Sequence, residues 1–147
     1  MSPSGFDIGM DDPRQAGVFE VDAGDLAPLA AAARDVGLQV RHIDLEGCRD
    51  KAALLLRIRT TLDFPRGWGR NWDGLLDALR DLSWLPAPGY VLAIDGAAQL
   101  QGNRPQDLQT LVEVLDDAAR AWAQAGVPFW ALLSAGSAPR AAFGRPR

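Results

Sequence analysis

The sequence predicts an α/β protein, in which a small, mostly parallel sheet of three to four strands is covered by helices. Short stretches that alternate between apolar and polar residues, or that are apolar throughout, indicate the strands. Longer stretches with an apolar residue at every third or fourth position lie between them and indicate helices. Strands separated by helices pair in parallel through right-handed crossovers. The chain has 147 residues, of which 48% are hydrophobic and 23% charged, and this suits one soluble globular domain.

The first part of the chain holds a loose segment, a strand and a helix. Residues 1–15 are polar, contain scattered glycine and proline, and are expected to be flexible. Residues 17–22 alternate and predict a strand. Asp25 is expected to cap an alanine-rich helix that stops at Gly37. Residues 38–45 alternate again and predict a second strand.

Two helices and a glycine-rich loop follow in the middle of the chain. Asp50 is in position to cap a helix over residues 51–62. Pro65 ends this region, because the residue before a proline disfavours helical backbone. The Pro/Gly-rich loop then leads into a helix over residues 71–82, for which Asn71 is the expected N-cap.

The C-terminal part continues the alternation of strand and helix. Residues 90–94 form a nearly continuous apolar run, as expected for a strand buried on both faces. Residues 99–104 predict a polar loop, residues 105–125 a long amphipathic helix, and residues 128–133 the last strand. Residues 135–147 are rich in Gly, Pro, Ala and Arg, and we expect them to be a disordered basic tail.

These elements predict a single domain over residues 16–134, in which residues 16–40 are an extra N-terminal strand and helix. The net charge is −4, and without the three tail arginines the chain has 12 basic against 19 acidic residues, a net charge of −7. An acidic body argues against direct binding to nucleic acid, whose phosphates attract Lys and Arg. It favours association with a basic partner, although solubility alone also explains it.

The residues needed for most enzyme chemistry are missing. The single histidine, His42, lies in the middle of a predicted strand, and the single cysteine, Cys48, excludes an internal disulfide and a cysteine-cluster metal site. No Gly-rich phosphate loop is present. We therefore expect no catalytic residues, no metal and no cofactor. The N-terminus lacks a secretory signal and no apolar run approaches the roughly 20 residues that span a bilayer, so we expect a cytoplasmic protein without membrane contact.

The predicted helix over residues 71–82 carries two different faces. Its apolar face is formed by Trp72, Leu75, Leu76, Leu79 and Leu82. Asp73 and Asp77 are four residues apart and lie above one another on another face, where like charges repel by a few tenths of a kcal/mol. Asp81 extends this row by one turn. This row has three interpretations: a solvated face, a general acid/base pair, or a surface for a basic partner.

With the preceding loop, this helix resembles the barstar family, the intracellular inhibitors of small secreted bacterial ribonucleases. The resemblance covers roughly residues 41–134, in which strand, helix, loop, helix, strand, long helix and strand follow the family's order. The motif that carries it is Phe64-Pro65-x-x-Trp68-Gly69-x-Asn71-Trp72-Asp73-x-Leu75-x-Asp77-x-Leu79.

In that family the loop and the following helix plug the nuclease active site, and their acidic groups stand in for the phosphates of the substrate. The resemblance implies that Asp77 enters the active site and that Asp73 is the acidic group one turn earlier. Five further positions match the family's partner-binding surface: Trp68, Gly69, Asn71, Trp72 and Leu76.

The chain also departs from the family pattern on this surface. Gly67 stands where the family has a second loop aromatic, and Leu76 stands where it has a tryptophan. The family's glutamate on the long helix falls on Ala121, and Asp117, one turn away, is the candidate to replace it.

The resemblance implies a non-enzymatic inhibitor of a bacterial ribonuclease that blocks the active site with the acidic helix and the adjoining loop. Its expected partner is a basic, extracellular-type ribonuclease, bound by a monomer in a one-to-one complex. The alternative is a barstar-like binding or immunity module whose partner is not a nuclease. A carboxylate–metal hydrolase is a third hypothesis, which only the row of aspartates supports.

Overall fold

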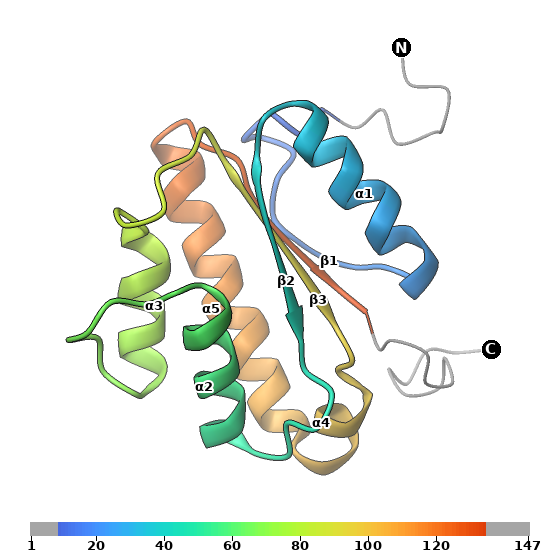
Figure 1. The fold of residues 1–147 in the computed structure, drawn as a ribbon, viewed down its shortest axis with the longest axis vertical. Helices are drawn as coiled ribbons and strands as arrows, with labels where there is room; N and C mark the ends of the chain where they lie inside the picture. The colour runs from blue at the N-terminus through green and yellow to red at the C-terminus, as the bar shows by residue number, and fades with distance from the viewer. Residues whose placement is uncertain (1–8, 135–147) are drawn as a thin grey trace.

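The structure is a computed structural model that describes residues 9–134. Four strands form one sheet in the order β1-β4-β3-β2, and every neighbouring pair runs parallel. The strands are β1 (Val18–Glu20), β2 (Gln39–Asp44), β3 (Tyr90–Asp95) and β4 (Phe129–Leu133). The predicted α/β class with a small parallel sheet is therefore confirmed (Figure 1).

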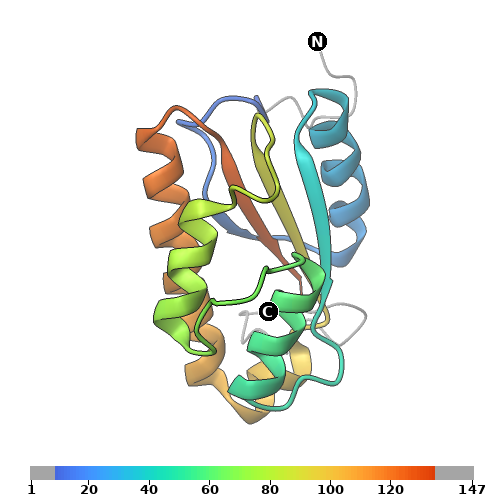
Figure 2. The ribbon, with the colours of Figure 1, turned by 60° about the vertical axis from the view of Figure 1, so that its left-hand side comes forward.

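Helices cover both faces of this sheet. Helix α1 (Ala23–Asp35) covers one face, and the other helices cover the opposite face. That layer contains α2 (Lys51–Thr61), α3 (Trp72–Asp81) and α5 (Pro105–Gln124), with the short α4 (Ala98–Asn103) leading from β3 into α5. Figure 2 shows α1 on the other side of the strands from α3 and α5, so the predicted acidic helix faces away from α1.

Strand β3 explains why the sheet carries helices on both faces. Tyr90, Leu92 and Ile94 belong to the cluster beneath α2, α3 and α5, whereas Val91 and Ala93 belong to the cluster beneath α1. Successive side chains of a strand point to opposite faces, so an uninterrupted apolar run must be covered twice. The expectation of a strand buried on both faces is confirmed.

The N-terminal segment packs onto the face that α1 covers. Met10 is buried, and its carbonyl accepts a hydrogen bond from the Trp130 indole nitrogen at 2.8 Å. Backbone bonds from Asp12 to Gly9 and from Gln15 to Asp12 form turns in the same segment. Residues 9–15, part of the segment expected to be flexible, are thus tied to the sheet. Residues 1–8 and the expected basic tail, 135–147, lie outside the described residues.

Of the N-caps predicted for α1 and α2, one is confirmed and one is wrong. Asp50 caps α2 as predicted, since its carboxylate accepts a hydrogen bond from the Ala53 amide at 3.0 Å. The cap predicted at Asp25 is wrong, because α1 already begins at Ala23 after Asp22. The Asp25 amide donates to the Asp22 carbonyl at 2.9 Å, so Asp25 lies inside the first turn, where its charge favours the helix N-terminus.

The polar loop predicted over residues 99–104 is also wrong, because most of it is the helix α4. Leu100 is fully buried, and the amides of Gln101 and Arg104 donate to the carbonyls of Ala97 and Leu100 at 2.8 and 2.7 Å. Gly102 has low helix propensity, but burial of Leu100 against the core outweighs it, as tertiary packing often does for short helices.

Candidate partner-binding surface

The loop between α2 and α3 is held in place by hydrogen bonds to its backbone. Arg59, near the end of α2, donates to the Trp68 carbonyl at 3.1 Å. The Trp84 indole nitrogen, from the turn after α3, donates to the Leu62 carbonyl at 2.9 Å. Gly67 has a φ of 106°, a backbone conformation that glycine adopts without steric cost. The loop is therefore held at its start by Trp84 and at Trp68 by Arg59.

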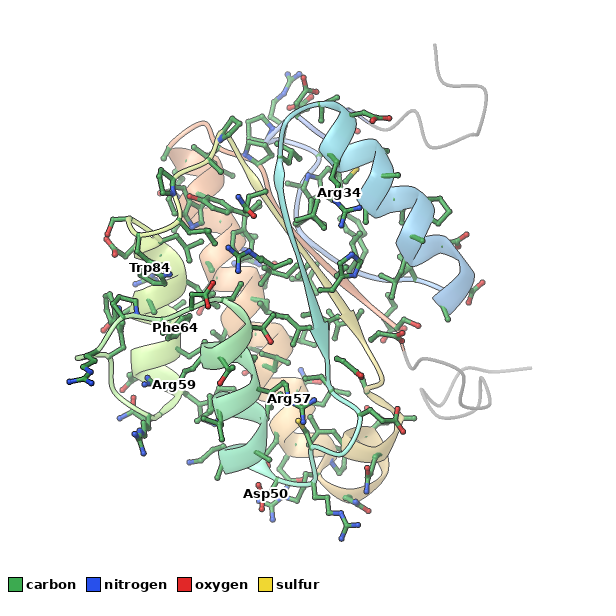
Figure 3. The ribbon with its side chains drawn as sticks, in the orientation of Figure 1. Arg34, Asp50, Arg57, Arg59, Phe64 and Trp84 are labelled. Carbon is green, nitrogen blue, oxygen red and sulfur yellow. The ribbon has the colours of Figure 1, made fainter. Side chains whose placement is uncertain are left out.

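Three aromatic rings reinforce this loop. Phe64 meets Trp84 edge-on with ring centroids 5.4 Å apart, and the Trp68 ring also contacts Trp84, with centroids 6.0 Å apart. The Arg59 guanidinium lies over the Phe64 ring, 5.9 Å from its centroid. Figure 3 shows Arg59, Phe64 and Trp84 along one edge of the molecule, beside α3 and away from α1. Trp68 is half-buried, so only part of its ring is available to a partner.

Helix α3 begins where the sequence predicts, because Asn71 caps it. The Asn71 backbone is extended, with a φ of −143° and a ψ of 177°, and its side-chain oxygen accepts a hydrogen bond from the Gly74 amide at 2.7 Å. Asp73 follows in the first turn, where the free amides and the helix dipole favour a negative charge. Asn71 is thus a structural cap, and its exposed position leaves it at the edge of the candidate surface.

Loop and helix also touch directly at two glycines. A Cβ placed on Gly74 would lie 2.3 Å from the Gly69 carbonyl oxygen and 2.8 Å from the Gly69 carbonyl carbon. The missing side chain of Gly74 therefore lets the loop backbone lie against the first turn of α3. This contact sets how far Gly69 and Trp68 stand from Asp73.

The two aspartates at the centre of the prediction are exposed. Within the described residues, neither Asp73 nor Asp77 has a hydrogen-bond or ion-pair partner. Asp81 differs, because its carboxylate accepts a hydrogen bond from the Ser83 hydroxyl at 2.8 Å. Trp72 and Leu76 are half-buried and pack against the main core cluster. The helix thus buries its apolar face and presents two unpaired carboxylates.

Helix α3 packs on α5, which carries the last predicted site residue. The Trp122 indole nitrogen of α5 donates to the Leu79 carbonyl of α3 at 2.7 Å, and the Trp122 ring lies 5.3 Å from that of Tyr90. Asp117 is exposed on α5, and no hydrogen bond or ion pair ties it to the aspartates of α3 within residues 9–134. Its assignment to the partner-binding surface stays a prediction.

The single histidine and the single cysteine lie outside the loop and helix of the candidate surface. His42 is exposed on β2, with Arg34 at 3.1 Å from its ring nitrogen. Cys48 is buried, and burial raises the pKa of its thiol, so it stays protonated at neutral pH. In the same part of the chain, no group of three or more His, Cys, Asp or Glu side chains is arranged to hold a metal ion.

Among residues 9–134, no helix combines the length and the apolar character needed to cross a bilayer.

Sequence reasoning missed Trp84 and Gly74 as parts of this surface. The sequence places Trp84 only in a loop, and its contact with Trp68 joins residues on either side of α3. The sequence did contain a signal for Gly74, because an isolated glycine inside a helical pattern costs about 1 kcal/mol relative to alanine.

Comparison with solved structures shows the fold. Two structures of the Aeropyrum pernix ORC2 protein, one of ADPNP-ADP complexes and one of the ADP form, superpose with a TM-score of 0.55 each. They are 20% and 19% identical in sequence, and the matches cover 82% and 88% of this chain. This chain spans only 35% and 36% of those proteins, so the similarity describes an α/β architecture.

Comparison with sequences identifies the family. No curated protein matches the chain significantly. The family model described as Barstar (barnase inhibitor) matches residues 38–134, which is well over half of the sequence. That range begins just before β2 and ends just after β4, so it contains α3, the loop before it and α5, but leaves out β1 and α1. The chain therefore belongs to the barstar family.

Proposed function

We propose that this protein inhibits a bacterial ribonuclease by placing α3 and the loop before it in the active site of the enzyme. One observation carries the proposal. Asp73 and Asp77 are exposed and, within the described residues, unpaired on a helix that is firmly positioned, in a chain whose family is described as a barnase inhibitor.

The charges of α3 suit a cationic cleft. Asp73 and Asp77 repel each other at a spacing of four residues, which costs the free protein a few tenths of a kcal/mol. Cations placed between them turn this repulsion into attraction. A ribonuclease active site must hold phosphates and therefore supplies such cations. The two carboxylates would then stand in for phosphates of the RNA.

The fixed position of α3 supports tight binding. The Asn71 cap, the Gly69–Gly74 contact and the bond from Trp122 to Leu79 hold the helix and loop before any partner arrives. A preorganised surface loses less conformational entropy on binding. We expect a one-to-one complex whose association rate falls as salt rises, because salt screens the attraction between opposite charges.

The test compares inhibition by three versions of the protein. Barnase and the ribonucleases in the host secretome are assayed for RNA cleavage with wild type, Asp77→Ala and Asp35→Ala. Asp35 is an exposed aspartate at the end of α1, so Asp35→Ala is a matched change of charge on the opposite side of the sheet.

We expect Asp77→Ala to weaken inhibition by about 100-fold or more, since breaking a buried ion pair costs about 3 kcal/mol. Asp35→Ala should inhibit like the wild type. Equal inhibition by Asp77→Ala and the wild type would refute the assigned surface.

The second candidate is a barstar-like binding or immunity module for a partner other than a nuclease. It is favoured by Ala121, a half-buried residue at the position that carries a glutamate in the family pattern. A pull-down from host lysate and secretome decides between the two. Capture of a protein without ribonuclease activity that depends on Asp77 supports this second function.

A further inference from the structure

A hollow lies beside the candidate surface, between the loop before α3 and the turn after it. Its volume is about 420 Å³, and it is open to solvent. The loop contributes Pro65, Arg66, Gly67 and Trp68, and the end of α3 and the turn after it contribute Asp81, Ser83 and Trp84. Of these seven residues, only Pro65 and Trp68 belong to the family motif.

Two of the residues that line the hollow are tryptophans whose rings lie close together. The rings of Trp68 and Trp84 are 6.0 Å apart and inclined at 48°. Trp84 is fixed by its hydrogen bond to the Leu62 carbonyl and by the edge-on Phe64 ring. The faces of tryptophan rings attract cations, and they do so more strongly than those of tyrosine or phenylalanine.

Asp81 is the one carboxylate among the residues that line the hollow. It is the last residue of α3, where the negative end of the helix dipole makes a carboxylate unfavourable. Leu82 follows with a φ of 45°, a left-handed conformation that is rare for leucine, and it turns the chain so that Ser83 meets Asp81. Ser83 bonds only one carboxylate oxygen, Oδ2, through its hydroxyl at 2.8 Å and its amide at 3.3 Å. The second oxygen, Oδ1, is left to accept a donor from a ligand.

Two arginines bring positive charge to the same region. Arg66 lines the hollow, and Arg80 lies in the last turn of α3. Both side chains are exposed, and neither has a hydrogen-bond or ion-pair partner among the described residues. Both are therefore free to turn toward solvent, whereas Asp81 is held by Ser83. A cation in the hollow would meet the held Asp81 carboxylate and the side chains of Trp68 and Trp84, so a cation is the favoured occupant.

We propose that this hollow receives an arginine side chain of the ribonuclease partner, as an anchoring point separate from the active-site contacts of Asp73 and Asp77. The flat guanidinium stacks on the indole faces and donates hydrogen bonds to Asp81, a combination that lysine reproduces only in part. This inference rests on the proposed function and adds the chemistry of one partner residue to it.

The first experiment measures binding to barnase with two variants of opposite sign. Asp81→Asn keeps an oxygen for the Ser83 bond but removes the charge, and we expect the affinity to fall about tenfold, mainly through faster dissociation. Arg66→Ala removes the competing cation, and we expect the affinity to rise about twofold. Thermal unfolding must show that both variants are folded. Unchanged affinity in both variants, with Asp77→Ala still disruptive, overturns the hollow and leaves the proposed function intact.

The second experiment needs no partner protein. Arginine amide and citrulline amide, which differ in that the guanidinium of the first is an uncharged urea in the second, are titrated into the wild type and into Asp81→Asn. The indole N–H signals of Trp68 and Trp84 are followed by NMR. The hollow predicts larger shifts with arginine amide, and smaller ones in the variant. Equal shifts with both amides, or no difference between the two proteins, contradict it. Arginine-specific shifts without inhibition of barnase or of any ribonuclease in the host secretome would support the hollow while refuting the proposed function.

Discussion

Replacing Gly74 by alanine tests whether the position of the loop, and not only the charge of the helix, determines binding. A Cβ at this position would lie 2.3 Å from the Gly69 oxygen, 2.8 Å from its carbonyl carbon and 2.9 Å from its Cα. Real Cβ atoms essentially never come closer than 3.0 Å to such atoms. All three neighbours are backbone, so no side chain can rotate away. The loop must therefore retreat by at least about 0.7 Å to reach that limit.

Two opposing effects decide the stability of this variant. Alanine in place of glycine stabilises a helix interior by about 1 kcal/mol, and the φ of Gly74 is not left-handed, so the helix accepts the change. The retreating loop weakens the bond from Arg59 to the Trp68 carbonyl, which is worth about 1 kcal/mol. We expect the free energy of unfolding to change by less than about 1 kcal/mol.

Binding should respond much more strongly than stability. Contact surfaces work when their residues stay within about 0.5 Å of the productive geometry, and the required shift exceeds this. We expect inhibition of barnase to weaken at least about tenfold. Urea denaturation and a ribonuclease inhibition assay measure the two quantities on the same preparation.

Gly24→Ala is the matched control for this prediction. Gly24 lies in α1, and a Cβ added to it would have no neighbouring atom within 4 Å, so alanine should be tolerated there without affecting inhibition. The reasoning fails if Gly74→Ala inhibits barnase as well as the wild type. A fall of several kcal/mol in stability would also refute it, because the loop contact would then be part of the fold.

The other predictions concern stability. Asp77→Ala should raise the free energy of unfolding by a few tenths of a kcal/mol or more, as repulsion disappears and helix propensity improves, and urea denaturation measures this. Asn71→Ala should lower it by about 1 kcal/mol in the same assay, and Asn71→Asp should restore it. Gly96→Ala should cost about 2 kcal/mol in thermal unfolding, because Gly96 has a φ of 74° and a Cβ there would lie 2.8 Å from two polar atoms. Burial raises the pKa of Cys48, so the unfolded chain loses its thiol proton at a lower pH than the folded chain. The free energy of unfolding should therefore fall as the pH rises past the ordinary thiol pKa, and Cys48→Ala should reduce this dependence on pH in urea denaturation.

The parts of the fold that sequence reasoning predicted depend on local signals. Asp50 and Asn71 are N-caps because each is an Asp or Asn residue directly before an amphipathic stretch, where its side chain can accept a bond from a helix amide. The apolar run over residues 90–94 is typical of a strand covered on both faces, and the structure confirms this prediction. Such signals lie within a few residues and need no knowledge of the rest of the chain.

The parts that were missed depend on contacts between distant elements. Helix α4 forms because Leu100 is buried in the core, although Gly102 and Asn103 disfavour a helix. The pairing of Trp84 with Trp68 requires the turn after α3 to return to the loop before it. Periodicity carries no information about either contact. The candidate surface was therefore predicted as a row of aspartates, without the aromatic and glycine contacts that position it.

The contacts that stabilise α3 do not involve its charged side chains. The four ion pairs among residues 9–134 involve Asp12, Asp63, Asp107 and Asp116, and none uses a carboxylate of α3. The helix is instead held by a neutral cap, by close backbone packing and by a tryptophan bond to a carbonyl. A helix held by its own salt bridges would have to break them before it could meet a cationic cleft. Because α3 is held by uncharged groups, its unpaired carboxylates cost the free protein little and remain fully available to a partner.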